Sequence, residues 1–262
     1  MQIQDKVVVV TGAASGIGRG LARRFAAEGA AAVVAVDRDA PGASAVADEL
    51  AATGTTTLGL AADVSLEADL VAAIERTEDE LGPIDLFCSN AGILAIGGAE
   101  LPDDEWRRIL DVNLMAHVYA ARHLVPRMIG RGGGYLLNTC SAAGLLTQIG
   151  SAPYSVTKHA AVGFAEWLAV TYGDRGLKVS ALCPQAVESK MTVGVEGGGV
   201  AGVDGMLTPE QVAQAVIEGL SDERFLILPH PEVIDYFRRK ASDYDRWLAG
   251  MRRLQARFGI EM

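Results

Sequence analysis

Tyr154 and Lys158 stand four positions apart in the stretch YSVTK. In a helix this spacing puts both side chains on one face, about one turn apart. A phenol has a pKa near 10 and is a poor base at neutral pH, but nearby positive charge favours the phenolate. A shift of about three pKa units needs roughly 4 kcal/mol of differential interaction. A lysine together with a positively charged ring would supply it in a partly dry cleft, so Tyr154 is a candidate acid/base for hydride chemistry.

Two polar residues upstream would complete such a site. Ser141 ends a predicted strand 13 residues before Tyr154 and offers a hydroxyl to hold a substrate oxygen. Asn113 is a poor helix former in the apolar stretch DVNLM, which predicts a local break, such as one that holds a water next to Lys158. Taken singly, Ser141 would be a cap, Asn113 an exposed helix residue, and Tyr154 and Lys158 a surface pair on a helix. Their joint arrangement favours a site.

Short apolar runs alternate with helical patterns along the chain. The strands are expected at residues 6–12, 31–37, 56–63, 84–92, 134–141, 177–184 and 225–229. The helices between them are expected at residues 16–28, 40–53, 66–81, 103–129 and 153–174. Continuous apolar strands separated by helices are typical of a parallel sheet covered on both faces. We therefore predict an α/β fold: a doubly wound, seven-stranded parallel sheet of the Rossmann type, in a single domain over residues 1–262.

The first strand leads through the glycine-rich turn TGAASGIG into a helix. Gly12, Gly16 and Gly18 would let the backbone turn tightly and approach a pyrophosphate at the helix amino end. Asp37 ends the second strand, 37 − 18 = 19 residues on, close to the spacing of a ribose-binding acid. A carboxylate there accepts from the ribose hydroxyls and repels a 2′-phosphate, which favours NAD. Arg38 beside it keeps NADP open as the alternative, since an arginine can hold a phosphate.

Two further strand ends carry polar residues. Asp63 ends the third strand, where it would either meet an adenine amino group or cap the next helix. Asn90 opens the small-residue stretch NAG at the end of the fourth strand. It would either hydrogen-bond neighbouring strands beside a cofactor or form an ordinary turn.

In order and spacing, these motifs resemble the short-chain dehydrogenase/reductase family from the first strand to about Ser189. The resemblance implies a catalytic set of Asn113, Ser141, Tyr154 and Lys158, with Tyr154 as acid/base and Ser141 orienting the substrate oxygen. Lys158 would bind the nicotinamide ribose and lower the pKa of Tyr154, and Asn113 would support a water relay. The resemblance also implies hydride transfer at nicotinamide C4 without a metal, and commonly a homotetramer or homodimer.

The resemblance extends to the cofactor-binding residues. They are Gly12, Ser15, Gly16, Ile17, Gly18, Asp37, Asp63, Val64, Asn90, Ala91, Gly92, Tyr154, Lys158, Pro184, Val187 and Ser189. The stretch CPQAVES departs from the family pattern: Gln185 replaces a glycine, and Ser189 stands where a threonine is usual. Gln185 would narrow the pocket or bond to the substrate. Cys140, where a second serine is common, is interpreted as packing.

The segments beside the site are mostly apolar and contain no basic cluster. They contribute Ile93, Leu94, Ile96, Leu145, Leu146, Met191 and Val193. We infer a secondary alcohol or ketone with an apolar or aromatic body as substrate, although core packing explains some of these residues equally well. The glycine-rich residues 190–208 are expected to form a mobile lid, with a plain linker as the alternative.

Residues 232–257 carry an apolar stripe at helical spacing and basic residues opposite it. They predict one amphipathic C-terminal helix that packs on its own or a neighbouring subunit. His230, just before it, would approach the substrate or lie at the surface.

The composition of the 262-residue chain limits the function classes. A net charge of −10 argues against nucleic acid as a partner. No apolar run approaches a membrane span, and the start MQIQDKVVVV lacks a secretory layout. The three cysteines are too few and too widely spaced for a disulfide framework or a zinc site, so a reducing, cytoplasmic location is expected.

The sequence therefore predicts an NAD-dependent alcohol dehydrogenase or ketone reductase. Three alternatives remain: an NADP-dependent reductase on the same scaffold, a cofactor-sensing binding protein that has lost catalysis, and a sugar epimerase or dehydratase of the extended relatives. The intact Ser141, Tyr154 and Lys158 speak against the second. The third usually needs a longer substrate domain than this chain has.

Overall fold

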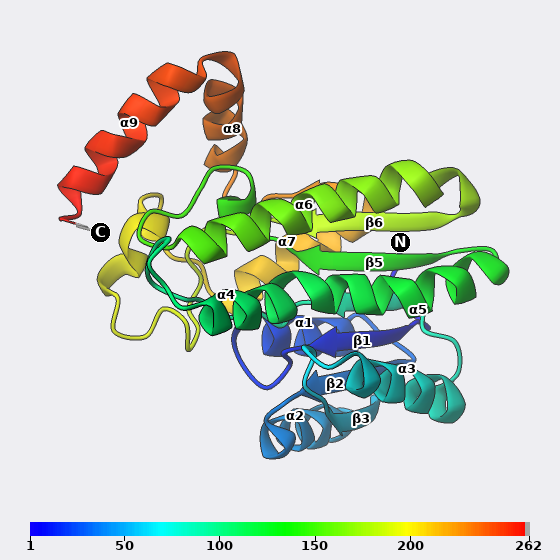
Figure 1. Ribbon diagram of the computed structural model, residues 1–262. Coiled ribbons are helices and arrows are strands. Elements are labelled where there is room, and N and C mark those ends of the chain that lie inside the picture. Colours follow the sequence, from blue (N-terminus) through cyan, green and yellow to red (C-terminus); the bar gives the residue numbers. More distant parts are fainter. Residues whose placement is uncertain (260–262) are drawn as a thin grey trace.

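The computed structural model describes residues 1–259 and contains one parallel sheet of seven strands in the order β3-β2-β1-β4-β5-β6-β7 (Figure 1). The strands are β1 Val7–Thr11, β2 Ala32–Asp37, β3 Thr56–Ala61, β4 Leu86–Ser89, β5 Gly134–Thr139, β6 Leu177–Leu182 and β7 Leu226–Ile227. This confirms the predicted seven-stranded, doubly wound sheet; the last three residues of the predicted domain lie outside the described range. Because β1 pairs with both β2 and β4, the strand order reverses there, which is where such sheets bind ligands.

Helices cover both faces of this sheet. They are α1 Gly16–Ala27, α2 Ala40–Ala51, α3 Glu67–Leu81, α4 Asp103–Leu110, α5 Ala116–Gly130, α6 Ala152–Tyr172, α7 Pro209–Ser221, α8 Glu232–Ser242 and α9 Tyr244–Arg257. On one face, Phe25 of α1 and Val216 of α7 belong to a buried core with β1. On the other face, Ile74 of α3 and Leu124 of α5 belong to a second core. The β-branched strand residues contribute to both, as parallel strands buried on two faces must.

The predicted helix over residues 103–129 is interrupted. A π-helical turn, η1, spans Asp111–Met115 between α4 and α5 and includes Asn113. The predicted local break is therefore confirmed. Single π turns inside α-helices are frequent at functional sites.

The predicted single C-terminal helix over residues 232–257 is corrected to two helices, α8 and α9. Asp243 between them is extended, and its side chain accepts a hydrogen bond from the Arg246 backbone N–H (3.0 Å). An aspartate in this position caps a new helix by satisfying one of its free N–H groups, so the first helix ends there. Figure 1 shows α9 projecting away from the body of the sheet. None of the described helices has the length and apolarity needed to cross a bilayer.

Candidate active site

The carboxyl ends of the strands open into a cavity of about 1610 Å³. Of the predicted cofactor and catalytic residues, all line this cavity except Gly18 and Asn113. Of the predicted substrate walls, Ile93, Leu94, Ile96, Leu146 and Met191 line it. Leu145 is buried behind the wall and Val193 is exposed outside it. The sheet topology thus brings together residues spread from Gly12 to Ser189.

The turn between β1 and α1 needs its glycines. Gly12 has φ +66°, and a Cβ there would lie 2.9 Å from Ala91 Cα. A Cβ on Gly18 would lie 2.1 Å from the Gly12 carbonyl oxygen. Gly18 therefore allows α1 to pack closely against the turn, although Gly18 itself does not line the cavity. The backbone is therefore open to the cavity at the amino end of α1, where N–H groups are free to meet an anion.

Thr11 holds the crevice beside this turn together. Its Oγ1 accepts from the backbone N–H groups of Asn90 (2.9 Å) and Ala91 (3.1 Å). The Asn90 side chain donates to the Thr11 carbonyl (3.0 Å) and accepts from Thr139 Oγ1 (3.1 Å). Asn90 therefore joins the ends of β1 and β5 across β4. Of the two alternatives that the sequence left open for Asn90, this is hydrogen bonding to neighbouring strands. Thr11 was part of the glycine motif, but only the structure gives it this role.

The two acids at the strand ends are held by local backbone. Asp37 accepts from the N–H groups of Ala14 (3.0 Å) and Asp39 (3.0 Å), so its carboxylate is fixed at the mouth of the glycine turn. Asp63 accepts from the backbone and side chain of Ser65 (2.9 and 2.6 Å) and still lines the cavity. Asp63 therefore forms a local turn with Ser65 and does not cap α3, whose N-cap is Leu66 and has no side-chain cap bond. Its second oxygen accepts no hydrogen bond from the residues that the structure describes.

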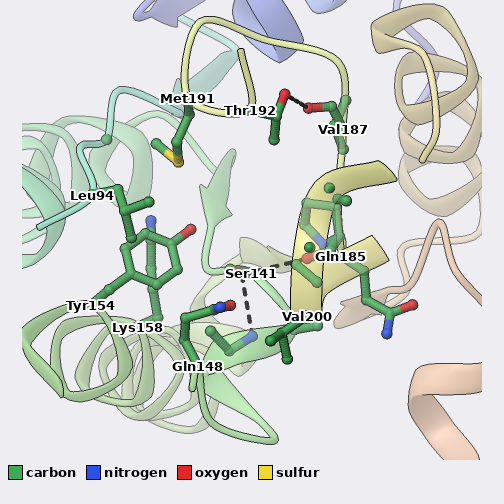
Figure 2. Close-up of a pocket in the computed structure, with 18 of the residues that line it drawn as sticks. Leu94, Ser141, Gln148, Tyr154, Lys158, Gln185, Val187, Met191, Thr192 and Val200 are labelled. Carbon is green, nitrogen blue, oxygen red and sulfur yellow. Dashed lines mark hydrogen bonds between the residues drawn. The ribbon is translucent and has the colours of Figure 1, made fainter. Parts of the chain in front are cut away.

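Tyr154 and Lys158 project from α6 into the cavity, as Figure 2 shows. Lys158 Nζ lies 5.6 Å from the centre of the Tyr154 ring and donates to the Thr139 carbonyl (2.8 Å). Burial raises the pKa of Tyr154, and a hydrogen bond to Ser141 opposes this rise. Burial also lowers the pKa of Lys158. The predicted downward shift of the Tyr154 pKa is therefore not produced by the protein chain alone; it requires further positive charge in the cavity.

Ser141 holds a strained backbone conformation at the end of β5. Its φ of 69° and ψ of 150° lie in a region that only glycine adopts freely, at a cost on the order of 1–3 kcal/mol. The Oγ accepts from the Ala143 N–H (3.2 Å) and points toward the Pro184 carbonyl (3.4 Å) (Figure 2). The strain is maintained at a residue that faces Tyr154, as expected where a hydroxyl is placed for function.

Asn113 is fully buried behind the cavity wall. Its Oδ1 accepts from the Ile93 N–H (2.8 Å), and its Nδ2 donates to the Ile93 carbonyl (2.9 Å) and to Thr157 Oγ1 (3.3 Å). The side chain therefore ties the loop after β4 to α6. A Cβ on Gly92 would lie 3.4 Å from Asn113 Oδ1 and 3.5 Å from Lys158 Nζ, so these groups are neighbours.

The segment after β6 contains Gln185, where the family pattern has a glycine. The Gln185 backbone N–H donates to His230 Nδ1 (3.2 Å), and Figure 2 shows the Gln185 side chain pointing away from Tyr154. Gln185 therefore does not narrow the cavity beside Tyr154. The Cys140 thiol is buried, and burial raises its pKa to about 12, which agrees with a packing role.

Helix α8 contacts two segments beside the cavity, one at Leu145 and one at Asp204. The sequence did not predict these contacts. Lys240 is buried and donates to the Leu145 carbonyl (2.7 Å), and it lies 3.2 Å from His159 Nε2. The Tyr236 hydroxyl donates to Asp204 (2.8 Å) in the segment predicted as a lid. No sequence pattern distinguishes Lys240 from the other basic residues of the tail; only its burial does.

His117 is a buried titratable group that the sequence analysis missed. Burial first, and the charge of Lys158 second, lower its pKa to about 3, whereas the unfolded chain titrates near 6.5. The unfolded state then binds a proton that the folded state does not. Stability is therefore complete above about pH 6.5 and falls by about 1.4 kcal/mol per pH unit, for this histidine, as the pH drops toward 3.

We expect the free energy of unfolding to fall between pH 6.5 and pH 5, before most carboxylates titrate. His159 and His230 also have lowered pKa values and add to the slope. His117→Gln should reduce the slope by about one proton, as measured by urea denaturation at a series of pH values. An unchanged slope in His117→Gln would contradict the assignment of this proton to His117.

The doubly wound sheet thus carries a glycine turn after β1 and, at the same edge, Ser141 after β5 beside Tyr154 and Lys158 of α6. A family model described as short chain dehydrogenase matches residues 6–197. The chain belongs to this family, and it is an oxidoreductase of hydroxyl or carbonyl groups.

Relatives and solved structures agree with this assignment over nearly the whole chain. The 1-deoxy-11-beta-hydroxypentalenate dehydrogenase of Streptomyces exfoliatus is 38% identical, covering 93% of this chain and 90% of its own. The cyclohexanol dehydrogenase of an Acinetobacter species (strain SE19) is 33% identical, covering 89% and 95%. A short-chain dehydrogenase/reductase of Burkholderia phymatum, solved in complex with NAD, superposes with a TM-score of 0.86 at 29% identity, covering 94% and 96%.

Proposed function

We propose that this protein transfers a hydride between NAD(H) and a secondary alcohol or ketone with an apolar body, with Tyr154 as the general acid/base. One observation carries the proposal: Tyr154, Lys158 and Ser141 line the same cavity as the glycine turn and Asp37. This arrangement supports a proton-transfer role for Tyr154 in a cavity that could also hold a dinucleotide.

The cavity fits a dinucleotide on three counts. First, Gly12 and Gly16 leave no side chain in the way: a Cβ on Gly12 would meet Ala91, and a Cβ on Gly16 would meet Ser189. The amino end of α1 offers N–H groups for a pyrophosphate. Asp37 is fixed where ribose hydroxyls would be bound. The bound nicotinamide would accept or supply the hydride at C4 and, when oxidised, add positive charge.

The protein chain then handles the proton and the orientation. The Ser141 hydroxyl holds the substrate oxygen next to Tyr154. As an alcohol is oxidised, the Tyr154 phenolate takes the hydroxyl proton while the hydride leaves the carbinol carbon; ketone reduction is the reverse. Lys158, anchored on the Thr139 carbonyl, holds a positive charge near the phenol that favours the phenolate. Asn113 keeps the neighbouring loop in place and supports the path by which the proton reaches solvent.

The proposed preference for NAD over NADP is based on the charge of the residues near the adenosine ribose. The Asp37 carboxylate repels a 2′-phosphate at the position where NADP differs from NAD. Arg38 also lines the cavity and is the observation that supports an NADP-dependent reductase as the second candidate. Comparing the Michaelis constants of NADH and NADPH separates the two.

The substrate body is proposed from the walls around Tyr154. Leu94, Leu146, Ile149 and Met191 line this part of the cavity, and Figure 2 shows Leu94 and Met191 on the side of the Tyr154 ring. Apolar walls of this kind bind hydrocarbon bodies and leave a few polar groups to set orientation. The hydroxyl-bearing substrates in the names of the two relatives fit the same class.

A screen of cyclic and aromatic ketones and secondary alcohols, followed by NADH absorbance, tests the proposed function. We expect turnover with at least one apolar cyclic ketone and NADH. Tight NADH binding with no turnover of any ketone or alcohol would instead favour a cofactor-sensing protein.

The segment over residues 190–208 lines the cavity and has several glycines at positive φ, which supports its proposed role as a lid.

We propose that the protein is a homodimer or homotetramer that associates through α6. Three large apolar side chains on one face of this helix are exposed: Val156 by 50%, Trp167 by 53% and Val170 by 86%. Trp167 also stacks with Phe164 and meets Tyr172 edge-on, which makes a rigid aromatic patch. Exposed patches of this kind mark association surfaces.

Trp167→Glu should lower the mass of the oligomer measured by light scattering, because it places a charge in the proposed interface. Leu66→Glu is the matched control, since Leu66 is equally exposed (54%) but lies outside α6. A monomeric wild-type protein, or an equal effect of both substitutions, would refute α6 as the interface.

A further inference from the structure

The outer wall of the cavity is formed by the C-terminal helices and carries positive charge. Four arginines line it: Arg239 on α8 and Arg246, Arg253 and Arg257 on α9. The three on α9 follow the spacing i, i+7, i+11 and therefore share one face of the helix. The adjoining face contributes apolar side chains to the same cavity, namely Trp247, Met251, Leu254 and Phe258.

Among residues 1–259, no carboxylate forms a salt bridge with these arginines, although the chain has a net charge of −10. Over residues 232–259, the one carboxylate that lines the cavity is that of Asp243, between α8 and α9, which caps α9. A cluster of unpaired cations in an acidic protein indicates a site for an anion.

The cofactor's phosphates are not the anion that these arginines suit. The proposed pyrophosphate site lies at the amino end of α1, and the proposed adenosine end lies at Asp37, Asp39 and Asp63, at and just after the ends of β2 and β3. Figure 1 shows α8 and α9 on the opposite side of the sheet from α2 and β3. The arginines therefore lie away from the proposed adenosine end of the cavity, so an anion bound by them would be a group other than the cofactor phosphates.

The base of this wall is anchored. Buried Lys240 ties α8 to the Leu145 carbonyl, next to the substrate wall residue Leu146, and Tyr236 ties it to Asp204. The Arg239 guanidinium lies over the Tyr236 ring at 5.7 Å from its centre. Arg239 is exposed at the rim of the cavity, and the guanidinium fork is suited to bidentate contact with a carboxylate.

We propose that the substrate is an amphipathic keto or hydroxy acid: an apolar body whose reacting carbon lies at Tyr154 and whose carboxylate, remote from that carbon, is bound by the arginines of α8 and α9. The cavity of about 1610 Å³ exceeds the roughly 300–1,000 Å³ of pockets for single small ligands, which leaves room for such a body beside a dinucleotide. This inference rests on the proposed function, and it adds a basic cluster on α8 and α9 to the apolar substrate walls expected from the sequence.

The test compares a rigid fused-ring keto acid, dehydrolithocholate, with its methyl ester. Each is measured as a substrate with NADH and as a competitive inhibitor of the best ketone from the screen. We expect the wild-type protein to bind the acid roughly tenfold more tightly than the ester, because hydrogen bonds between charged groups are the stronger ones. This preference should weaken as salt is added, since the arginines are exposed.

The variant R246Q/R253Q should reduce the difference between acid and ester, because it removes two of the four arginines that line the cavity. R252Q is the matched control: Arg252 lies on the same helix and carries the same charge, but it does not line the cavity, so the preference should persist. Equal affinity for acid and ester in the wild-type protein, no binding of either, or an unchanged preference in R246Q/R253Q would each overturn the inference. A loss of oligomer mass in R246Q/R253Q, with the preference intact, would assign the arginines to a subunit contact instead.

The two proposals fail in different ways. Turnover of neutral ketones with NADH, without any preference for the acid, refutes the carboxylate site and leaves the proposed function standing. Tighter binding of the acid than of the ester, without turnover of any ketone, supports the arginine site and refutes the proposed function.

Discussion

Tyr154→Phe is expected to lower kcat by about a thousandfold or more while leaving NADH affinity within about threefold of wild type. The substitution removes one hydroxyl from a side chain that lies beside Ser141 and Lys158 in the cavity. A positioned acid/base contributes roughly 10²–10⁴ to the rate, and loss of the hydroxyl leaves the substrate oxygen without a proton partner. The cofactor contacts proposed at the glycine turn and at Asp37 do not involve this hydroxyl. Steady-state kinetics and a fluorescence titration with NADH measure the two quantities separately.

Tyr172→Phe is the matched control for this experiment. Tyr172 ends the same helix, loses the same atom, and packs against Trp167 rather than facing the cavity. It should retain wild-type kcat. Undiminished turnover in Tyr154→Phe would refute Tyr154 as the acid/base, and equal losses in both variants would point to damage to α6 rather than to chemistry.

The pH dependence of the reaction follows from the same site. Burial raises the pKa of Tyr154 in the protein chain, and a positively charged nicotinamide would lower it. In the oxidation direction the phenolate is the active form, so kcat/KM should rise with pH through the Tyr154 pKa of the oxidised complex and reach a plateau above it.

Asp37→Ala is expected to raise the ratio of kcat/KM with NADPH to that with NADH by about 10- to 100-fold. The carboxylate is fixed at the mouth of the glycine turn by the N–H groups of Ala14 and Asp39. Bringing a 2′-phosphate to this position sets like charges side by side, which costs several kcal/mol, and each 1.4 kcal/mol is a factor of ten. Steady-state kinetics with both cofactors at one fixed ionic strength measure the ratio.

Asp37→Asn separates charge from structure in this prediction. It removes the negative charge and keeps an oxygen that accepts from one of the two N–H groups. Both variants should shift the ratio in the same direction. Cofactor discrimination that stays as in wild type would remove Asp37 as the selector and would leave Arg38, which lines the same end of the cavity, as the residue to test for NADP binding.

The sequence by itself determined the sheet and the set of residues at its edge. Apolar strands such as β1 and β2, separated by helical stretches, admit little but a parallel sheet with two covered faces. Once that sheet is granted, residues at strand ends as distant as Asp37 and Ser141 must meet at one edge, because parallel strands end on the same side. The break at Asn113 was also visible, since its helix propensity conflicts with its setting.

The tertiary structure decided what depends on contacts between distant segments. The strained backbone of Ser141, the pKa of buried His117 and the upward shift of the Tyr154 pKa follow from surroundings that no local pattern records. The end of α8 at Asp243 was signalled only by a capping residue within a stretch whose apolar spacing continues unbroken. The placement of the tail beside the cavity depends on buried Lys240, whose partners lie 95 and 81 residues away along the chain. Helical periodicity predicts which faces of a helix are apolar or charged, but only tertiary packing determines which residues those faces contact.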